Sequence, residues 1–455
     1  MIQAREAIQA VRRRQAPDRL RAAAPTVSET FDAFAAYAGA SSEAIYGANT
    51  LPGHNDDKRV SAEALRDYQR NLLESHAIGD APWFDAGSVR AMTLAKAVSV
   101  SHGATPIHPE RFIAMLDAIE DADFHPRIPL EASYSSGDVI PGAHWALALI
   151  ERAPGPLGPG EGMALMNGEF IHLGAGLRLA QELEELWRCC LLVQRVSLRL
   201  MDADHGAFTA GLGSGVHPAA VDAIRYIGEG LQRGARATQD PVSFRTVCQQ
   251  VEALAAGLAD FGAALDLALS RPSENPLFIG GRHCAHGGFV EPLLTVRTGA
   301  VIETLLVQAW MSNARLTHLL SGRRAGLPPE AACEEDALGL IQWPKLSRAI
   351  LEDSRRDAGV RAFASGSSTS HDIEDFSSFG LRETRSARRL CSRVFDMLAI
   401  ELTSAVWLAR QVGRDLPTSE EFAMLNEARP GGLKEARSVL SRAGEAGAPE
   451  AFQPH

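Results

Sequence analysis

The sequence predicts an all-α fold with a central bundle of long helices. Over several long stretches apolar residues recur at intervals of three and four, the spacing of one face of an α-helix. No alternation of apolar and polar residues persists long enough to predict a sheet. Residues 290–320 contain, after Pro292, one glycine and no further proline, so they predict a single helix of about thirty residues. Helices of that length need a bundle in which to bury their apolar faces.

Four stretches carry the helical pattern most clearly. The first, residues 178–202, places Leu183, Trp187 and Leu191 on one face. The same spacing recurs in three later stretches, residues 246–269, 290–320 and 384–412.

Proline and glycine clusters separate the predicted helices, at residues 153–163, 322–330 and 364–380. The last cluster is polar and rich in ionisable groups, which fits either a linker or a catalytic loop held by rigid helices. We therefore expect three parts, namely an N-terminal helical region that carries a Ser-Ser-Gly loop (1–180), a central long-helix bundle (181–412) and a C-terminal tail (413–455).

The composition is that of an ordinary globular protein. The chain has 455 residues, of which 45% are apolar and 22% charged, so it can bury a sizeable core. Its net charge of -11 argues against a sequence-independent nucleic-acid surface, because such a surface needs clustered Lys and Arg. A small-molecule partner fits this charge better.

The cysteines and the N-terminal sequence favour a cytoplasmic location. No pair of the six cysteines has C-x-x-C spacing, and the adjacent Cys189 and Cys190 make a poor ligand or disulfide pair, so we expect buried reduced thiols. Residues 1–14 lack the apolar core of a signal peptide, and no stretch approaches about eighteen consecutive apolar residues. We expect no membrane partner, and an amphipathic helix or a frayed end at residues 5–22.

Seven short motifs follow one another along the chain. They are I-Y-G-A-N-T at 45–50, Q-R-N-L-L-E-S-H-A-I-G at 69–79, S-V-R-A-M-T-L-A-K-A at 88–97, A-L-M-N-G at 164–168, T-Q-D-P-V-S-F-R at 238–245, S-E-N-P-L-F at 273–278 and I-E-D-F-S-S-F-G at 373–380. In this order they resemble the aromatic amino acid lyase family, and within it the histidine ammonia-lyases. The resemblance runs from about residue 40 to about residue 410. It implies a subunit with fumarase/aspartase-like lyase superfamily architecture, and a homotetramer whose active sites draw on three subunits.

The resemblance also gives a role to the S-S-G run. By itself the run is an ordinary turn, because Ser, Gly and Asp favour turns and helix caps. The resemblance implies that Ser135, Ser136 and Gly137 cyclise autocatalytically to 4-methylidene-imidazole-5-one (MIO), an electrophile, with no metal or nucleotide cofactor. Gly137 permits the tight backbone that ring closure needs. Ser136 supplies the hydroxyl that is eliminated, and Ser135 contributes only its carbonyl.

Three further residues match positions that handle the amino acid backbone in the family. Tyr46 would be the base that removes the proton beta to the amino group, and for this the site would have to lower the pKa of its phenol with nearby positive potential. Arg245 would bind the substrate carboxylate through two parallel hydrogen bonds. Asn167 would hold the substrate and the electrophile.

His76 and Glu374 bear on the substrate side chain. Both match positions of family members that act on histidine, and Glu374 is counted with the catalytic residues. A carboxylate that faces the substrate suits an imidazole or another donor-bearing group and is costly to desolvate against a bare phenyl ring. We therefore expect an aromatic or nitrogen-bearing amino acid as substrate. Gln249 is retained from the segment that follows the arginine in the family, and we assign it to substrate binding.

Several departures from the family pattern lie at the predicted site. Val242 replaces a tyrosine that stands beside the electrophile, the G-F-G after Y-G-V-N-T is lost, and A-H-G-G-F-V replaces G-G-N-F-H-G at 285–290. Two interpretations remain. Either the ring forms and the enzyme eliminates or migrates ammonia from an unusual amino acid, or the scaffold performs ring-independent chemistry in specialised metabolism or serves as a non-catalytic binding subunit.

Other functional classes are less well supported. The fumarase and aspartase group also uses a serine loop, but its G-S-S-x-M-P-x-K-x-N signature is absent. A metal site at His283, Cys284 and His286 lacks an adjoining acidic partner in a metal-site pattern. A helical interaction protein without catalysis is the remaining alternative.

Overall fold

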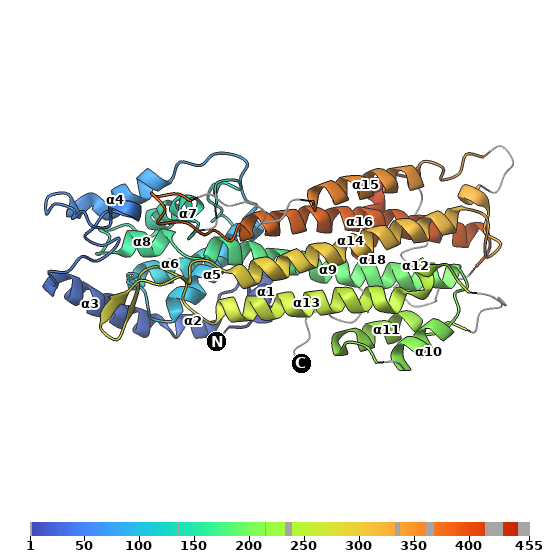
Figure 1. Ribbon diagram of the computed structural model, residues 1–455, viewed down its shortest axis with the longest axis horizontal. Helices are drawn as coiled ribbons and strands as arrows, with labels where there is room; N and C mark the ends of the chain where they lie inside the picture. The colour runs from blue at the N-terminus through green and yellow to red at the C-terminus, as the bar shows by residue number, and fades with distance from the viewer. Residues whose placement is uncertain are drawn as a thin grey trace. The chain divides into compact units, whose positions relative to one another are not determined.

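A computed structural model describes residues 2–134, 136–213, 215–232, 239–332, 337–359, 368–414 and 431–444. Helices dominate these residues, which confirms the predicted all-α class (Figure 1). The chain divides into two compact units. Unit 1 comprises Met1–Ala180, Gly262–Val296 and Ala362–Arg385, and unit 2 comprises Gln181–Phe261, Arg297–Arg361 and Ser386–His455. Unit 1 thus joins the predicted N-terminal region to two later segments.

The four long helices lie where the sequence predicts them. They are α9 (Phe170–Leu200), α13 (Val247–Leu269), α14 (Pro292–Leu320) and α16 (Gly380–Gln411), and the boundaries between the units fall within them. Only α9 begins clearly earlier than predicted. Its first turns contain His172, Gly174 and Gly176, which interrupt the apolar pattern although all three are buried.

Unit 1 is otherwise built from short helices. They are α1 (Ala4–Arg13), α2 (Asp18–Arg21), α3 (Ala24–Ala40), the 3-10 turn η1 (Gly53–Asn55), α4 (Leu65–His76), α5 (Ala86–Ser101), α6 (Pro109–Glu120), α7 (Val139–Arg152) and α8 (Glu161–Met166). Helix α5 is buried on all sides between Ser88 and Val100 and packs on α1 and α6, while α4, α7 and α8 pack together. Glycine allows the closest approach, since a Cβ at Gly142 of α7 would lie 1.9 Å from the Met166 carbonyl oxygen.

A short hairpin in unit 1 was not predicted. Strand β1 (Leu277–Ile279) pairs antiparallel with β2 (Arg282–Cys284). The two residues between them, Gly280 and Gly281, have φ values of 61° and 78°, as a tight hairpin turn requires. Strands of three residues are too short to show a period, so the Gly-Gly pair was the available signal.

Unit 2 adds shorter elements to its parts of the long helices. They are α10 (Gly206–Gly213), η2 (Pro218–Ala220), α11 (Val221–Gly228), α12 (Val242–Arg245), η3 (Pro329–Ala331), α15 (Trp343–Asp357) and α18 (Leu433–Gly444). Helix α18 lies within the predicted C-terminal tail. It buries Ala436 and Leu440, and Ser441 donates a hydrogen bond of 2.7 Å to Glu185, so this part of the tail is packed.

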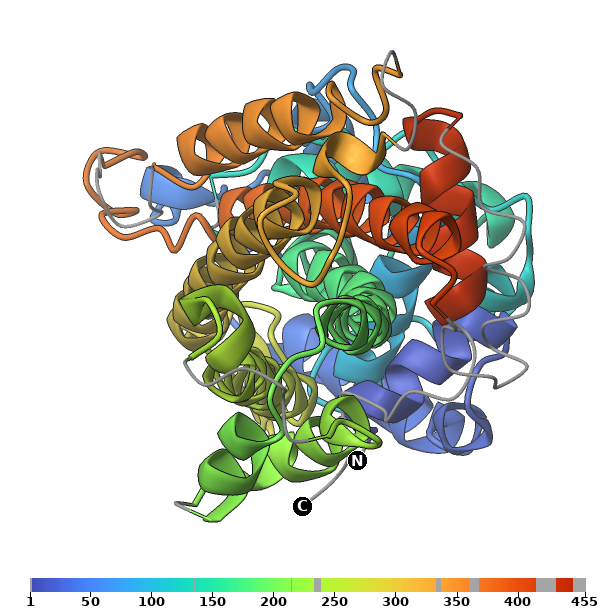
Figure 2. The same ribbon diagram turned by 90° about the vertical axis from the view of Figure 1, so that its right-hand side faces the viewer.

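The long helices of unit 2 enclose a buried polar network. Four stretches of these helices run side by side (Figure 2), namely residues 181–200, 247–261, 297–320 and 386–411. At their centre Arg315 donates to both oxygens of Glu401, at 2.7 and 3.0 Å, and both side chains are fully buried. Ser197 donates to Glu401, and Gln250 accepts from Arg315. These bonds join α9, α13, α14 and α16.

Two further findings bear on the expected location. None of the described helices is both long and apolar enough to span a bilayer. The five cysteines within the described residues are free, and four of them are buried whereas Cys284 is half-buried. Cys333 lies outside the described residues.

Candidate active site

The S-S-G loop precedes α7 in unit 1. Ser135 lies outside the described residues, Ser136 is 6% exposed, and Gly137 has φ 73°, a left-handed conformation that suits glycine. Both polar groups of the Gly137 backbone are engaged. Its N–H donates to the Phe289 carbonyl at 3.2 Å, and its own carbonyl accepts from the Gly168 N–H at 3.1 Å. The loop is therefore held from two sides.

Asn167 lies directly against this loop. A Cβ at Gly137 would lie 3.0 Å from the Asn167 amide nitrogen. The side-chain oxygen of Asn167 accepts from the backbone of Asn275, and its carbonyl accepts from Lys96 Nζ at 2.8 Å. Lys96 in turn pairs with Glu274 at 2.9 Å, and both are fully buried. The motifs that contain Lys96 and Glu274 thus position Asn167.

Tyr46 lies in a turn, and a side chain of α4 links this turn to α8. The buried amide of Gln69 donates to the Gly47 carbonyl and accepts from the Gly162 N–H, both at 2.9 Å. Because Asn167 directly follows α8, one side chain links the turn of Tyr46 to the helix that presents Asn167. The Q-R-N-L-L-E-S-H motif therefore contributes a structural residue that the sequence did not single out.

The surroundings of the Tyr46 phenol differ from what the sequence led us to expect. Its oxygen accepts a hydrogen bond of 3.2 Å from the Gly53 N–H. Burial raises the pKa of Tyr46, and the negative charges of Glu374 and Asp56 add to the rise, while the Gly53 bond opposes it. Burial and negative neighbours, and not a positive potential, dominate the shift of the Tyr46 pKa. The expectation of a lowered pKa is therefore corrected.

Glu374 lies beside two tyrosines. The Tyr134 hydroxyl is 3.3 Å from each carboxylate oxygen, and Thr369 and Ser370 donate to Oε2 at 2.5 and 3.1 Å. Burial raises the pKa of Tyr134, and the charge of Glu374 adds to this effect. The same charge acts on Tyr46. Tyr134 directly precedes the S-S-G tripeptide, so it joins the loop to the group of Tyr46 and Glu374.

His76 finds its partners on its own helix. It is the last residue of α4, its Nδ1 lies 2.7 Å from the Leu72 carbonyl, and the hydroxyl of Ser75 lies 3.2 Å away. These bonds hold the imidazole through its Nδ1 at the end of the helix.

Arg245 and Gln249 belong to unit 2. Both are exposed, and Arg245, at the end of α12, donates to Gln239. Val242, which stands in place of the family tyrosine, begins α12 and is also exposed. Unit 1 thus holds Tyr46, Ser136, Gly137, Asn167 and Glu374. Arg245, expected to bind the substrate carboxylate, and Gln249, expected to bind the substrate, lie on the other unit.

A cluster of buried ionisable groups follows the tripeptide. Asp138 caps α7 with φ 46° and accepts from Ser133 through Oδ1, and burial raises its pKa to about 7. Glu169 and His172 stand at the start of α9, and their side chains meet at 2.9 Å. The backbone of Glu291 donates to the other oxygen of Glu169. The sequence analysis assigned no role to these residues.

The histidines of the hairpin have other partners than a metal. His283 Nδ1 lies 2.9 Å from the Tyr37 hydroxyl, and His286 Nε2 bonds to the Glu274 carbonyl. Within the described residues, no three His, Cys, Asp or Glu side chains are grouped so that they could hold an ion.

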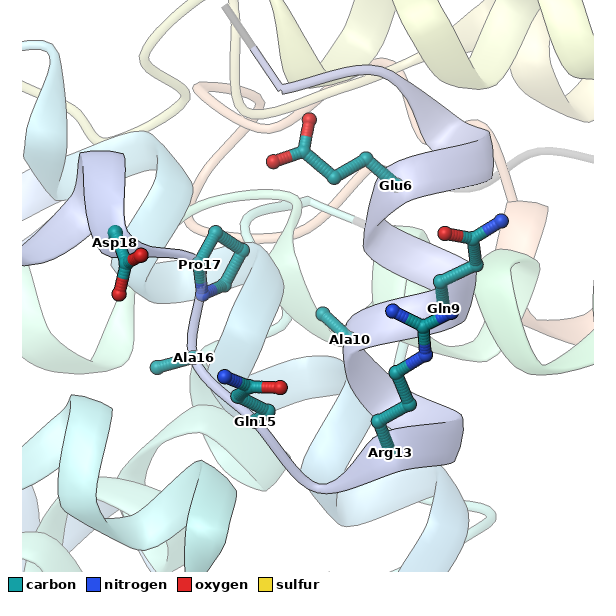
Figure 3. A pocket seen from close by; sticks show the side chains of 8 residues that line it. All are labelled: Glu6, Gln9, Ala10, Arg13, Gln15, Ala16, Pro17 and Asp18. Carbon is teal, nitrogen blue, oxygen red and sulfur yellow. The ribbon is translucent and has the colours of Figure 1, made fainter.

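A surface hollow near the N-terminus shares no residue with this site. Figure 3 shows its lining, from α1, α2 and the turn between them: Glu6, Gln9, Ala10, Arg13, Gln15, Ala16, Pro17 and Asp18. Of the lining side chains, the Glu6 carboxylate accepts a hydrogen bond of 2.9 Å from Arg19.

Comparisons with known proteins agree in family and in fold. The family model described as "Aromatic amino acid lyase" matches residues 3–155 and 150–428. The histidine ammonia-lyase of Geobacillus thermodenitrificans is 27% identical over 426 residues, covering 86% of this chain and 84% of that protein. Among solved structures, the phenylalanine aminomutase of Pantoea agglomerans superposes with a TM-score of 0.86 at 21% identity, covering 97% of this chain and 96% of that one. The ergothionase of Treponema denticola, an ergothioneine-degrading enzyme, superposes with a TM-score of 0.86 at 18% identity. The match covers 98% of this chain and 97% of that one.

Proposed function

Because the chain belongs to the aromatic amino acid lyase family, we propose that it is an ammonia-lyase or aminomutase for an amino acid with an aromatic or nitrogen-bearing side chain. Similarity to a histidine ammonia-lyase over most of both chains supports the reaction class. The observation that carries the proposal is the grouping in unit 1 of Tyr46, Ser136, Gly137, Asn167 and Glu374 around the tripeptide loop.

The described part of the tripeptide fits a cofactor made from the protein's own chain, as the family uses. Gly137 has the positive φ of a tight turn, Ser136 is buried, and Asn167 lies against the loop. We assign to Ser135, Ser136 and Gly137 the MIO group, which when formed supplies an electrophile for the substrate's amino group. No metal or nucleotide is part of the proposal.

Tyr46 removes the proton beta to the amino group in this proposal. A raised pKa leaves its phenol mostly protonated at neutral pH, so it acts through the small ionised fraction. Turnover should therefore increase as the pH rises. The Gly53 N–H, which bonds to the phenol oxygen, stabilises the ionised form.

Glu374 receives the substrate side chain. Thr369 and Ser370 donate to Oε2, whereas among the described residues Oε1 has the shared and longer contact with Tyr134. Oε1 can therefore accept a hydrogen bond from an N–H donor on the substrate. This arrangement favours a nitrogen-bearing side chain over a plain phenyl ring, and His76 at the end of α4 is the second residue that we assign to this selection.

In this proposal Arg245 binds the substrate carboxylate, and Gln249 contributes to substrate binding, from another copy of the chain. Both are exposed on unit 2, and a guanidinium suits a carboxylate. The homotetramer that the family resemblance implies would bring such residues to the site of a neighbouring subunit. Sedimentation of the purified protein tests whether it forms a homotetramer.

We also propose a cytoplasmic location for the protein.

Intact-mass spectrometry tests the core of the proposal. A chain that lacks the mass of two water molecules supports the cyclised tripeptide, while the unmodified mass in well-folded protein excludes the proposed reaction. Ammonia release should then be measured with histidine, phenylalanine and tyrosine. Product analysis separates an unsaturated acid, which a lyase makes, from the beta-amino acid of an aminomutase.

A further inference from the structure

Next to the tripeptide loop, unit 1 buries a pair of ionisable residues that the proposed reaction does not use. Glu169 is 3% exposed and His172 is fully buried, and Glu169 Oε2 lies 2.9 Å from His172 Nδ1. Burial lowers the pKa of His172 to about 4 and raises that of Glu169 well above its ordinary value. His172 is therefore uncharged, and the contact is a hydrogen bond and not an ion pair. Burying polar groups is costly unless they are hydrogen-bonded, and here the two side chains bond to each other.

The second oxygen of Glu169 reaches a different segment of unit 1. Oε1 accepts a hydrogen bond of 2.9 Å from the backbone N–H of Glu291. Two residues earlier, the Phe289 carbonyl accepts the N–H of Gly137. One carboxyl group thus ties the start of α9 to the segment 289–291, which contacts the tripeptide.

The same carboxyl group is linked to the other side of the loop through the chain itself. Gly168, which precedes Glu169, donates its N–H to the Gly137 carbonyl at 3.1 Å. Both backbone hydrogen bonds of Gly137 therefore end on segments that Glu169 joins. His172 fixes the orientation of Glu169 by holding its other oxygen.

The position of the Gly137 nitrogen matters because ring closure is a demanding reaction for an amide. The nitrogen must form a bond to the carbonyl carbon of Ser135. The carbonyl oxygen of Ser135 leaves as water with the amide hydrogens of Ser136 and Gly137, and the Ser136 hydroxyl leaves as a second water with the Cα hydrogen of Ser136. No oxidant or reductant is needed. An amide nitrogen is a weak nucleophile, so the enforced approach of the two atoms supplies most of the acceleration.

We propose that Glu169, oriented by His172, is a positioning residue for the cyclisation of the tripeptide, because it fixes the Phe289 carbonyl against the Gly137 N–H. The inference rests on the proposed function, since it concerns how the electrophile arises. It assigns no contact with substrate to either residue.

The test follows the loss of water in chains made by cell-free synthesis, with the intact mass of the soluble fraction measured over time. Glu169→Asp keeps the carboxyl group but withdraws it by one methylene from Glu291 and His172. We expect ring closure to slow by about tenfold or more, as small misplacements of reacting groups do. Glu169→Gln has the same shape and can make both hydrogen bonds, so it should cyclise like the wild type.

Glu161→Gln is the matched control. Glu161 is also fully buried in unit 1, where it pairs with Arg111 at 2.8 Å and accepts from the backbone of His108, and it has no bond to the segments around Gly137. It should lose stability and cyclise at the wild-type rate. If Glu169→Asp does not fold, His172→Phe removes the partner that orients Glu169, and slower cyclisation is expected there.

Each outcome has one meaning. A wild-type chain that never loses water overturns the proposed function itself. If the wild-type chain cyclises and a folded Glu169→Asp chain cyclises equally fast, the positioning role alone is overturned. The same holds for His172→Phe where it replaces Glu169→Asp. Slow cyclisation of Glu169→Gln would also overturn it, because the charge and not the position would then be decisive.

Discussion

Tyr46 has the location of a catalytic base but not the electrostatic surroundings that the sequence led us to expect. Its turn is tied to α4 and α8, and its phenol lies close enough to Glu374 for the carboxylate to influence its pKa. A negative neighbour and burial both disfavour the phenolate. If Tyr46 is the base that we propose, its protonation limits how much of the enzyme is active at neutral pH.

Tyr46→Phe removes only the phenol oxygen. We expect turnover to fall by about 10²- to 10⁴-fold, the usual contribution of a general base. Intact mass should still show the loss of two waters. Tyr68→Phe is the control, because the Tyr68 hydroxyl donates to the Thr50 carbonyl. It should cost about 1 kcal/mol of stability and leave turnover unchanged. Retained activity in Tyr46→Phe would show that another group takes the proton.

The pH dependence follows from the direction of the Tyr46 pKa shift. The base form is the phenolate, and its pKa lies above the ordinary value of 10.0. Below that pKa, kcat/KM should rise about tenfold per pH unit and still be rising at about pH 9. A profile that levels off near neutral pH would mean that the assembled enzyme lowers this pKa after all.

Tyr134→Phe tests how Glu374 is held. The Tyr134 hydroxyl contacts both carboxylate oxygens, so its loss should leave Glu374 less well oriented toward the substrate. We expect KM for a nitrogen-bearing substrate to rise up to about tenfold with a smaller change in kcat, the effect of one hydrogen bond to a charged group. An equal change for substrates with and without a nitrogen donor would contradict this role.

Sequence reasoning found some of these residues and missed others for a physical reason. Tyr46, Asn167 and Glu374 stand within motifs whose order along the chain carries the information. Tyr134 and Glu169 have no diagnostic spacing, and only the fold brings them to Glu374 and to the segment 289–291. The roles of the site residues, including those found by motif, stay predictions until they are tested.

At the scale of elements, periodicity predicts helices well and misses what has no period. The stretches 246–269, 290–320 and 384–412 correspond to α13, α14 and α16 within a few residues. The hairpin of β1 and β2 was not predicted, because three-residue strands cannot show alternation. The early start of α9 was not predicted, because its glycines and buried histidine do not continue the apolar face of the helix.

Gly142→Ala tests the close contact between α7 and α8. The added Cβ would meet the Met166 carbonyl oxygen at 1.9 Å, and a backbone atom cannot move aside as a flexible side chain can. We expect a loss of about 2 kcal/mol or more in the free energy of unfolding, measured with urea. Gly39→Ala, in the last turn of α3 with open space around it, should instead gain up to about 1 kcal/mol. Equal effects would show that α7 and α8 can separate freely.

At the scale of the whole molecule, the chain crosses between its two units several times. The segments Gly262–Val296 and Ala362–Arg385 return to unit 1 after the chain has entered unit 2. A linear reading of the sequence places both segments in the central bundle, because their pairing with the N-terminal region depends on contacts between residues far apart. Such contacts leave no local pattern.

Arg315→Met tests the buried network of unit 2. The substitution leaves Glu401 buried, with Ser197 as a remaining donor, so the free energy of unfolding should fall by about 3–5 kcal/mol. Replacing Glu401 by Leu in the same chain removes the stranded charge and should recover much of that loss. Urea unfolding measures both. A single variant as stable as the double one would mean that water reaches Glu401.

The division of unit 1 among separate segments also determines when a nascent chain can complete it. Glu374 and the segment 289–291 leave the ribosome long after Tyr46 and Gly137, so the surroundings of the tripeptide are assembled only late in translation. Until then Gly137 lacks the Phe289 carbonyl as a hydrogen-bond acceptor. In the proposed reaction, ring closure therefore waits for the synthesis of residues 289–291, and a polypeptide that ends before them lacks this hydrogen-bond acceptor.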